Sequence, residues 1–345
     1  MAARLALAGH KTLLIEAGDD QGANINYTVP SFNARVSEDH NMAWNFFVNH
    51  YSDEKRQAKD YKTSYTLADG REYTGLSPPK GAKLKGVLYP RAATLGGCTA
   101  HNALIAVYPH QSDFDSIATL TGDNSWGASN MRKYYEKLEN NHYLNIPLPA
   151  GLPAVPLPGH EGHGSDGWLG TSYAPLDIVL KDPKLLSLVG GAAFALGNKT
   201  NAVVNLATLV AGDANANSLH RDTSNAMYQI PLSSTDGKRT GSREFVLSVS
   251  EAKNQDGSKK YPLDVRLNCH VTKVTFDKSA TPPRATGVEF LDGQHLYKAS
   301  PKYKGSKGTP GSVKASREVI ISGGTYVSHK SRLIFKKRTD LLLFF

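Results

Sequence analysis

A chain of 345 residues, 40% hydrophobic and 21% charged, is long enough for a large core and two domains, and its composition is typical of globular proteins. It contains no run of about 18 apolar residues, which excludes a membrane-spanning helix, and its two cysteines, far apart and in no metal-ligand spacing, exclude a disulfide framework and a cysteine zinc site. The net charge of +9 arises entirely from residues 298–345, a Gly/Lys/Ser-rich loop and a terminal tail, whereas a nucleic-acid partner would require a basic groove with interleaved aromatic side chains.

The first 16 residues are typical of one part of a nucleotide-binding unit. Ala2, Ala6 and Gly9 fall at i, i+4 and i+7 and predict a short helix with a face of small groups. Residues 12–15 form the short apolar run of a parallel strand that is buried on both faces. Glu16 ends that strand, where dinucleotide-binding units place an acid that accepts hydrogen bonds from the ribose hydroxyls. An ordinary helix and strand with a solvated glutamate is the alternative.

The glycine loop of such a unit lies about 20 residues before the acid, and Met1 is too close to Glu16 for that. Residues 19–88 are polar and turn-rich and contain an aromatic cluster at 44–51, which indicates an excursion from the nucleotide fold. Residues 127–141 predict an amphipathic helix, because Met131, Tyr134, Tyr135 and Leu138 follow helical spacing.

Later segments predict a boundary, a helix and three strands. The prolines between Pro147 and Pro158 end helical structure, and the loop at 160–167 makes this the best candidate domain boundary. The predicted elements after it are a helix at 185–196 and strands at 263–276, 285–291 and 318–322.

The histidines and cysteines outside these elements do not indicate chemistry. His160 and His163 lie in a glycine-rich loop with no third ligand at suitable spacing, so we expect solvated side chains and no metal. Cys98 is expected to be a small packing residue and not a nucleophile, because no base is near it in sequence.

The most informative stretch is YPRAATLGGCTAHNALI, residues 89–105. A glycine pair lets the backbone approach a flat or anionic ligand, and short hydrogen-bonding side chains flank it at Thr94, Thr99 and Asn102. This stretch resembles the flavin-contacting signature of the glucose-methanol-choline (GMC) oxidoreductases.

Other segments resemble the same family in order and spacing. They are AARLALAGHKTLLIEAGD at the start, AWNFFV (43–48), NSWGASNMRKYYEKLEN (124–140), GKRTGSREFVL (237–247), LDVRLNCHVTKVTFDKSATPPRATGVEF (263–290) and EVIISGGTYVS (318–328). The resemblance implies an α/β fold with α+β insertions, a Rossmann-like FAD-binding domain with part of a substrate-binding domain. It assigns 1–150 to the FAD-binding domain with the inserted region 19–88, 151–235 to the substrate-binding domain, and 236–328 to the return into the FAD-binding domain.

The resemblance also assigns cofactor contacts. FAD would be held by Glu16 at the ribose, Gly96, Gly97 and Thr99 near the pyrophosphate, Thr94 and Asn102 near the flavin ring, and Val271 at the adenine. His101 stands where choline oxidase-like members form a covalent bond to the flavin 8α-methyl group. A histidine that only hydrogen-bonds or fills the position is the alternative.

The implied activity is oxidation of the CH–OH group of a small-molecule alcohol by hydride transfer to flavin N5, with an unknown electron acceptor. In the family the glycine loop precedes the residues that match Ala2–Leu5, and the catalytic His pair follows the SGGT segment. The resemblance therefore predicts a chain truncated at both ends, with an aberrant tail at 329–345, no catalytic residue and no activity by itself. A non-redox or inactive protein on the same scaffold and an NAD-dependent dehydrogenase remain open, and the sequence does not indicate a compartment.

Overall fold

A computed structural model describes residues 1–146, 155–156, 161–175, 178, 181–195, 212–223 and 228–328. The chain forms two compact units, one of Met1–Asn102 with Val246–Phe345 and one of Ala103–Phe245. Residue 150, at which the sequence analysis ends the first domain, lies outside the described residues. The assignment of the domains therefore stays a prediction.

The first unit begins with a helix and a parallel strand, as predicted. Helix α1 (Ala2–Leu7) buries Ala3 and Ala6, and strand β1 (Thr12–Ile15) pairs in parallel with β12 (Leu263–Arg266). The prediction that β1 is buried on both faces is wrong, because Leu13 is 40% exposed. In the described part of the chain β1 and β12 form a two-stranded sheet, and the face of β1 that carries Leu13 is open to solvent.

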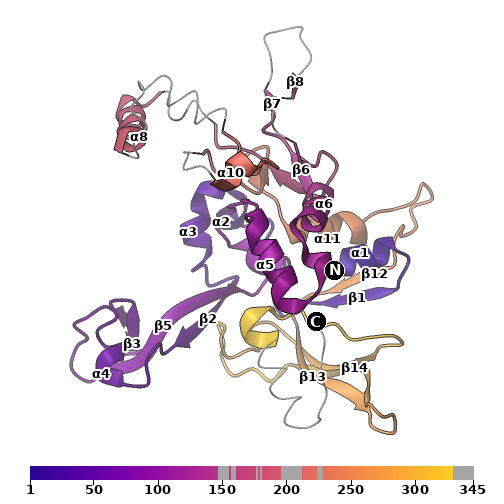
Figure 1. Ribbon diagram of the computed structural model, residues 1–345. Helices are drawn as coiled ribbons and strands as arrows, with labels where there is room; N and C mark the ends of the chain where they lie inside the picture. Colours follow the sequence, from indigo (N-terminus) through magenta and orange to yellow (C-terminus); the bar gives the residue numbers. More distant parts are fainter. Residues whose placement is uncertain are drawn as a thin grey trace. The chain divides into compact units, whose positions relative to one another are not determined.

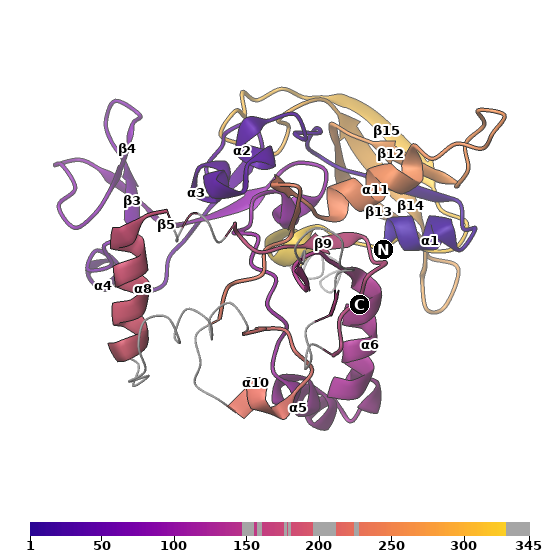
Figure 2. The same cartoon turned by 90° about the horizontal axis from the view of Figure 1, so that it is seen from above.

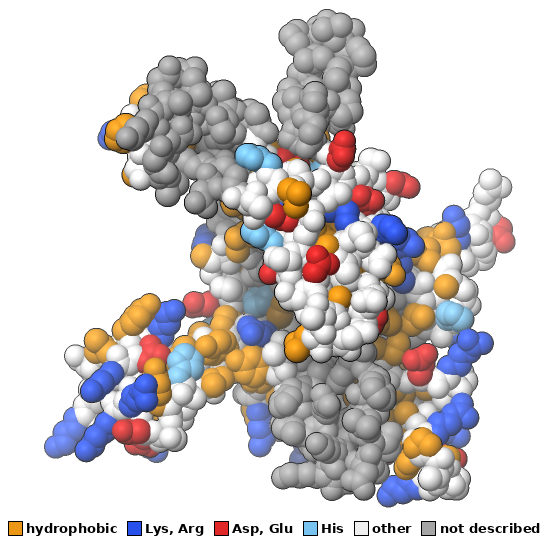
Figure 3. Space-filling view, viewed as in Figure 1, with side chains coloured by type: hydrophobic (Ala, Val, Ile, Leu, Met, Phe, Trp, Pro, Cys, Tyr) orange, Lys and Arg blue, Asp and Glu red, His pale blue; other side chains and the backbone are white. Residues whose placement is uncertain are grey.

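The strands between Ala43 and Ala92 form an antiparallel sheet and not a further βαβ unit. The sheet has the order β2–β5–β3–β4, with β2 Ala43–Val48, β5 Lys83–Ala92, β3 Thr63–Thr66 and β4 Glu72–Thr74 (Figure 1). Around β3 and helix α4 (Glu54–Gln57), basic, acidic and apolar side chains are interspersed on the surface (Figure 3).

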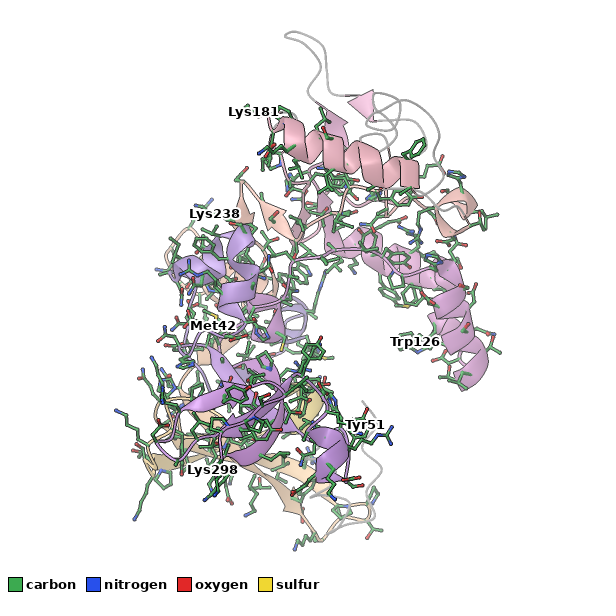
Figure 4. The ribbon with its side chains drawn as sticks, turned by 90° about the vertical axis from the view of Figure 1, so that its left-hand side faces the viewer. Met42, Tyr51, Trp126, Lys181, Lys238 and Lys298 are labelled. Carbon is green, nitrogen blue, oxygen red and sulfur yellow. The ribbon has the colours of Figure 1, made fainter. Side chains whose placement is uncertain are left out.

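The first unit also contains short helices before and after the strands of this sheet. They are α2 (Ile25–Thr28), η1 (Pro30–Phe32), α3 (Asn33–Val36) and the 3-10 turn η2 (Gly97–Ala100). Met42, which precedes β2, is completely buried with Tyr27, Val36 and Ala100 in a small core (Figure 4). This core connects the start of β2 to the turn that follows β5.

A second antiparallel sheet has the order β13–β14–β15, with β13 Cys269–Asp277, β14 Arg284–Asp292 and β15 Thr309–Lys314 (Figure 2). The strand predicted at 285–291 is confirmed by β14. The single strand predicted at 263–276 is instead two strands, because Asn268 adopts a φ of 53° that breaks the extended backbone between β12 and β13.

The strand predicted at 318–322 is also absent, because these residues have no hydrogen-bonded partner strand in the described part of the unit. Their apolar side chains pack against a core instead. Val319 and Ile321 pack against the buried cluster of Cys269, Val274, Val288 and Phe290.

The second unit has helices and short strand pairs. The helices are α5 (Gln111–Thr121), η3 (Asn124–Trp126), α6 (Ala128–Leu138), α8 (Pro183–Ala195) and α10 (Leu219–Thr223), and α11 (Ser242–Ser250) crosses into the first unit. The pairs are β6 (Glu139–Asn141) with β9 (Leu169–Thr171), β7 (Asn145–Ile146) with β8 (Val155–Pro156), and β10 (Ser234–Thr235) with β11 (Lys238–Arg239). The helices predicted at 127–141 and 185–196 are confirmed by α6 and α8.

The buried face of α6 differs from the predicted apolar face. Tyr134 is 65% exposed, whereas Arg132 is 4% exposed. The guanidinium of Arg132 is stabilised inside the unit because it donates to the carbonyl oxygens of Gly162 and Asn215 and its charge lies 4.0 Å from the ring centre of Tyr108.

The interpretation of His163 as a solvated loop residue is wrong. Its side chain is 6% exposed and lies between Glu139 and Asp213. His160 lies outside the described residues. Among the helices that the structure describes, none is long and apolar enough to cross a membrane.

Candidate functional site

The turn after β1 is joined to the segment after β5 by hydrogen bonds in the first unit. The carbonyl oxygen of Asp19 accepts from the Thr94 hydroxyl at 2.8 Å, across 75 residues of sequence, and from the Leu95 amide at 2.9 Å. Thr94 is buried. The acid turn and the glycine-rich segment, which are separate motifs in the sequence, therefore lie side by side in the fold.

Gly18 permits this approach. A Cβ atom at Gly18 would lie 1.8 Å from the carbonyl oxygen of Ala93, far below any real contact. Ala93 cannot move away easily, because its own amide donates to the carbonyl oxygen of Met42 at 2.6 Å. The position therefore excludes every side chain.

The glycine pair forms a tight turn with open space beside it. Gly96 and Gly97 have φ values of 100° and 57°, a region that favours glycine. The turn is held by the Thr99 hydroxyl, which donates to the carbonyl oxygen of Gly96 at 2.7 Å, and by the Gly97 amide, which donates to the carbonyl oxygen of Thr94 at 2.9 Å. No described atom outside the adjoining chain lies within 4 Å of the place where a Gly97 Cβ would stand.

A hollow with about 340 Å³ of empty space, part of it open to solvent, lies beside this junction. It is lined by Ala17, Gly18, Asp19, Asn41, Trp44, Ala93, Asn268, His270, His295, Leu296 and Tyr297. All of these residues belong to the first unit. The hollow thus combines the acid turn, the start of β2, the segment after β5 and the loop after β14.

Aromatic rings form part of the wall of the hollow. The rings of His270 and Tyr297 are stacked, with centres 5.3 Å apart and an angle of 29° between their planes. The Trp44 ring lies 4.9 Å from that of Tyr297 at 63°. Such flat apolar faces beside short polar groups suit a planar heteroaromatic ring.

Glu16 immediately precedes the lining residues and carries a perturbed carboxyl group. Burial raises the pKa of Glu16 to about 7, and hydrogen bonds from the backbone amides of Gly18 and Ala17 offset this effect only in part. The Gly18 amide lies 2.9 Å from Oε1. Among the residues that the structure describes, Glu16 has no ion-pair partner, so hydroxyl groups of a ligand would find a carboxylate in need of donors.

The other residues predicted to contact the cofactor, His101, Asn102 and Val271, do not line the hollow. His101 is buried at the end of η2, and Asn102 is exposed. Val271 is 37% exposed and is not among the lining residues, whereas the neighbouring His270 is. Adjacent residues of a strand point to opposite faces, which explains why one of the two lines the hollow. The proposed roles of all eight residues in cofactor binding stay predictions.

Asn41, His270, His295 and Tyr297 line the hollow but carry no signal in the sequence that points to a ligand. Asn41 lies in the excursion, and His295 and Tyr297 lie in a lysine-rich loop, without a motif. Only tertiary structure brings them to the hollow. Over the described residues, no group of three or more His, Cys, Asp or Glu side chains is arranged to hold a metal ion.

Comparisons with known proteins agree on one family. Residues 81–330 match the family model described as GMC oxidoreductase. The GMC oxidoreductase family protein Mala s 12 of Malassezia sympodialis is 27% identical over 240 residues, 68% of this chain and 32% of that protein. The alcohol dehydrogenase [acceptor] of Pseudomonas putida is 24% identical over 216 residues, 62% of this chain and 31% of that protein. The chain thus spans about a third of the length of these curated relatives.

Solved structures show the same fold. A formate oxidase variant of Aspergillus oryzae, studied for FAD modification, superimposes with a TM-score of 0.57 at 17% identity, covering 96% of this chain and 44% of that chain. A crystal structure of formate oxidase gives a TM-score of 0.58 at 18% identity with the same coverage. The predicted α/β fold class is thereby confirmed.

Gly18→Ala should destabilise the first unit. The added Cβ must displace the Ala93 backbone, and we expect the free energy of unfolding to fall by roughly 1–3 kcal/mol or more. Urea denaturation measures this value. Gly191→Ala in helix α8 is the control, because its Cβ would meet nothing within 4 Å and a helical Gly→Ala change gains up to about 1 kcal/mol. Equal effects of the two substitutions would contradict the close approach.

Glu16 should make the stability of the flavin-free protein depend on pH. Because its folded pKa of about 7 exceeds the unfolded value, its contribution is fully present below about pH 4.5 and is lost as the pH rises through 7. Glu16→Gln should remove this loss. At pH 8 its free energy of unfolding should exceed that of wild type by roughly 1–2 kcal/mol, and it should unfold at a higher temperature. Glu38→Gln, at an exposed glutamate, is the control. Parallel pH profiles for wild type and Glu16→Gln would rule out a buried carboxyl.

Proposed function

Because the chain belongs to the GMC oxidoreductase family, we propose that it forms the FAD-binding part of an oxidoreductase that acts on the CH–OH group of a small alcohol. The observation that carries the proposal is the junction of Asp19 with Thr94, which joins the acid turn to the glycine-rich segment inside the region matched by the family model. The match to an alcohol dehydrogenase of Pseudomonas putida supports an alcohol as the electron donor.

The residues at the junction fit FAD. Glu16 offers a partly buried carboxyl to the two ribose hydroxyls, which donate hydrogen bonds. The stacked rings of His270 and Tyr297 offer a flat wall to an adenine. Gly97 offers open space to a group that approaches the backbone closely.

When bound, FAD supplies the hydride-accepting chemistry, and the protein supplies binding and orientation. In this proposal Glu16 would hold the ribose, while Thr94 and Thr99 hold the turn through their bonds to Asp19 and Gly96. We assign 1–150 and 236–328 to the FAD-binding domain and 151–235 to the substrate-binding domain. We assign no general base to this chain and expect no turnover of alcohol by the chain alone.

The proposal is tested by FAD binding to wild-type protein and to Glu16→Gln. Quenching of flavin fluorescence at pH 8 should saturate with wild type, and Glu16→Gln should bind FAD about 10–100-fold more weakly, since bonds to a charged acceptor contribute about 1.5–3 kcal/mol. The same substitution is expected to raise the stability of the flavin-free protein. A loss of affinity together with a gain in stability separates a binding role from a folding defect.

Glu38→Gln provides the control and should bind FAD as wild type does. Unchanged affinity in Glu16→Gln would refute the ribose assignment, and absence of saturable binding by wild type would refute FAD binding by this chain. Dye reduction by the purified chain with an alcohol would refute the expectation that it lacks activity.

We further propose that a ring nitrogen of His101 can bond covalently to the flavin 8α carbon. In this step one C–H bond of the methyl group and the imidazole N–H bond would break, the flavin would take up the electron pair, and dioxygen would reoxidise it to the covalent oxidised flavin. It is buried and follows the glycine turn directly, next to Asn102 in the motif. After incubation with FAD in air and acid precipitation, the pellet should keep its flavin, and the tryptic peptide with His101 should be heavier by the mass of FAD less two hydrogen atoms. His101→Gln should give a colourless pellet, whereas His10→Gln, at an exposed histidine, should not. A colourless wild-type pellet would exclude the covalent bond.

A further inference from the structure

A buried histidine of the second unit lies between two carboxylates. Nδ1 of His163 is 2.7 Å from Oε2 of Glu139, and Nε2 is 2.8 Å from Oδ2 of Asp213. The three side chains are 6%, 0% and 1% exposed. Glu139 begins β6, His163 precedes β9, and Asp213 lies 50 residues further along the chain. The contacts therefore join three segments that are distant in sequence.

The two contacts require a positive charge on the ring. An ionised carboxylate only accepts hydrogen bonds, and an imidazole donates from both nitrogens only when it is protonated. A neutral His163 would turn a lone pair toward a carboxylate oxygen at less than 3 Å. The geometry thus describes an imidazolium shared by two anions.

Other donors keep both carboxylates ionised. Oε1 of Glu139 accepts from the Thr171 hydroxyl at 2.7 Å, the Tyr135 hydroxyl at 3.0 Å and the Asn141 amide at 3.2 Å, and Oε2 accepts from the Gly164 amide at 3.3 Å. Oδ1 of Asp213 accepts from the backbone amide of Asn215 at 2.9 Å and the Tyr143 hydroxyl at 3.3 Å. Neither carboxylate therefore depends on His163 for all of its hydrogen bonds, and His163 places one positive charge against both.

The groups that face His163 from the surrounding elements are neutral or already engaged. Tyr135 of α6 and Tyr143 lie with their ring centres 6.3 and 5.7 Å from the imidazole, and burial raises the pKa of both phenols. The Asn141 amide nitrogen lies 3.0 Å from Nδ1 and donates to Oε1 of Glu139. The buried cation of α6, Arg132, donates to the carbonyl oxygens of Gly162 and Asn215.

The electrostatics of the site agree with this geometry. Burial by itself lowers the pKa of His163, but the hydrogen bonds to Asp213 and Glu139 raise it to about 9. Burial raises the pKa of Glu139, but the bond from His163 and its charge hold it below the usual value.

We propose that protonated His163 is an electrostatic clamp of the second unit, which holds β6, the segment before β9 and the Asp213 segment together and releases them when the imidazole loses its proton. Loss of the proton leaves two buried carboxylates without a cation between them. Such a site is costly, because an unpaired buried charge destabilises a protein strongly. The clamp makes the fold of this unit sensitive to alkaline pH.

The test compares thermal unfolding of the full chain and of His163→Gln between pH 5 and 10. A folded pKa raised above the unfolded value gives a stabilisation that is present below about 6.5 and is lost as the pH rises through about 9. At pH 7 the variant should unfold about 5–10 °C below wild type. By pH 10 this difference should shrink by more than half. From pH 7 to pH 5 the variant should gain more stability than wild type, because one of its two carboxylates takes up a proton.

His142→Gln is the matched control, because His142 is exposed and lies three residues after Glu139. It should follow the wild-type profile throughout. A difference between wild type and His163→Gln that stays constant from pH 7 to 10 would mean that His163 acts by packing and would overturn the proposal.

A second measurement does not depend on folding of the variant. The chain contains 12 histidines, and in NMR spectra of wild-type protein one imidazole should keep its protonated shifts above pH 8. If all histidine signals titrate below pH 7.5, the clamp does not exist.

Discussion

The first unit depends on the contact between Gly18 and the backbone of Ala93. Only a residue without a side chain allows the acid turn to reach the segment that ends β5, and Asp19 then binds Thr94 and Leu95 there. The contact joins segments 75 residues apart. Because Gly18, Asp19 and Ala93 also line the hollow, the fit at one glycine sets this part of its wall.

The site that this contact creates opposes stability. A carboxyl group whose pKa is raised to about 7 by burial is ionised in part at neutral pH, and that charge destabilises the flavin-free fold. A glutamine at position 16 would avoid this cost. Retaining an acid there makes physical sense where a ligand supplies the hydrogen-bond donors that the protein lacks, which is the usual relation between a binding site and the stability of its scaffold.

The sequence predicted what is local and missed what is tertiary. Helix α1, strand β1 and helix α6 follow from spacing over a few residues, and the glycine pair at 96–97 follows from its turn chemistry. The burial of Arg132 and His163 could not be inferred, because it depends on carbonyl and carboxylate partners contributed by distant segments. At 318–322 the sequence predicted a strand that does not form. An apolar pattern is typical of a segment packed against a core as well as of a paired strand.

The two units treat a buried carboxylate in opposite ways. In the second unit the carboxylate of Glu139 contacts the positively charged ring of His163 and accepts hydrogen bonds from its neighbours. It can therefore be buried and ionised at once, and it stabilises the fold. In the first unit Glu16 has backbone donors only, and its ionisation is disfavoured until further donors arrive. The difference in partners, more than the difference in burial, distinguishes a carboxylate that stabilises the chain from one that is available to a ligand.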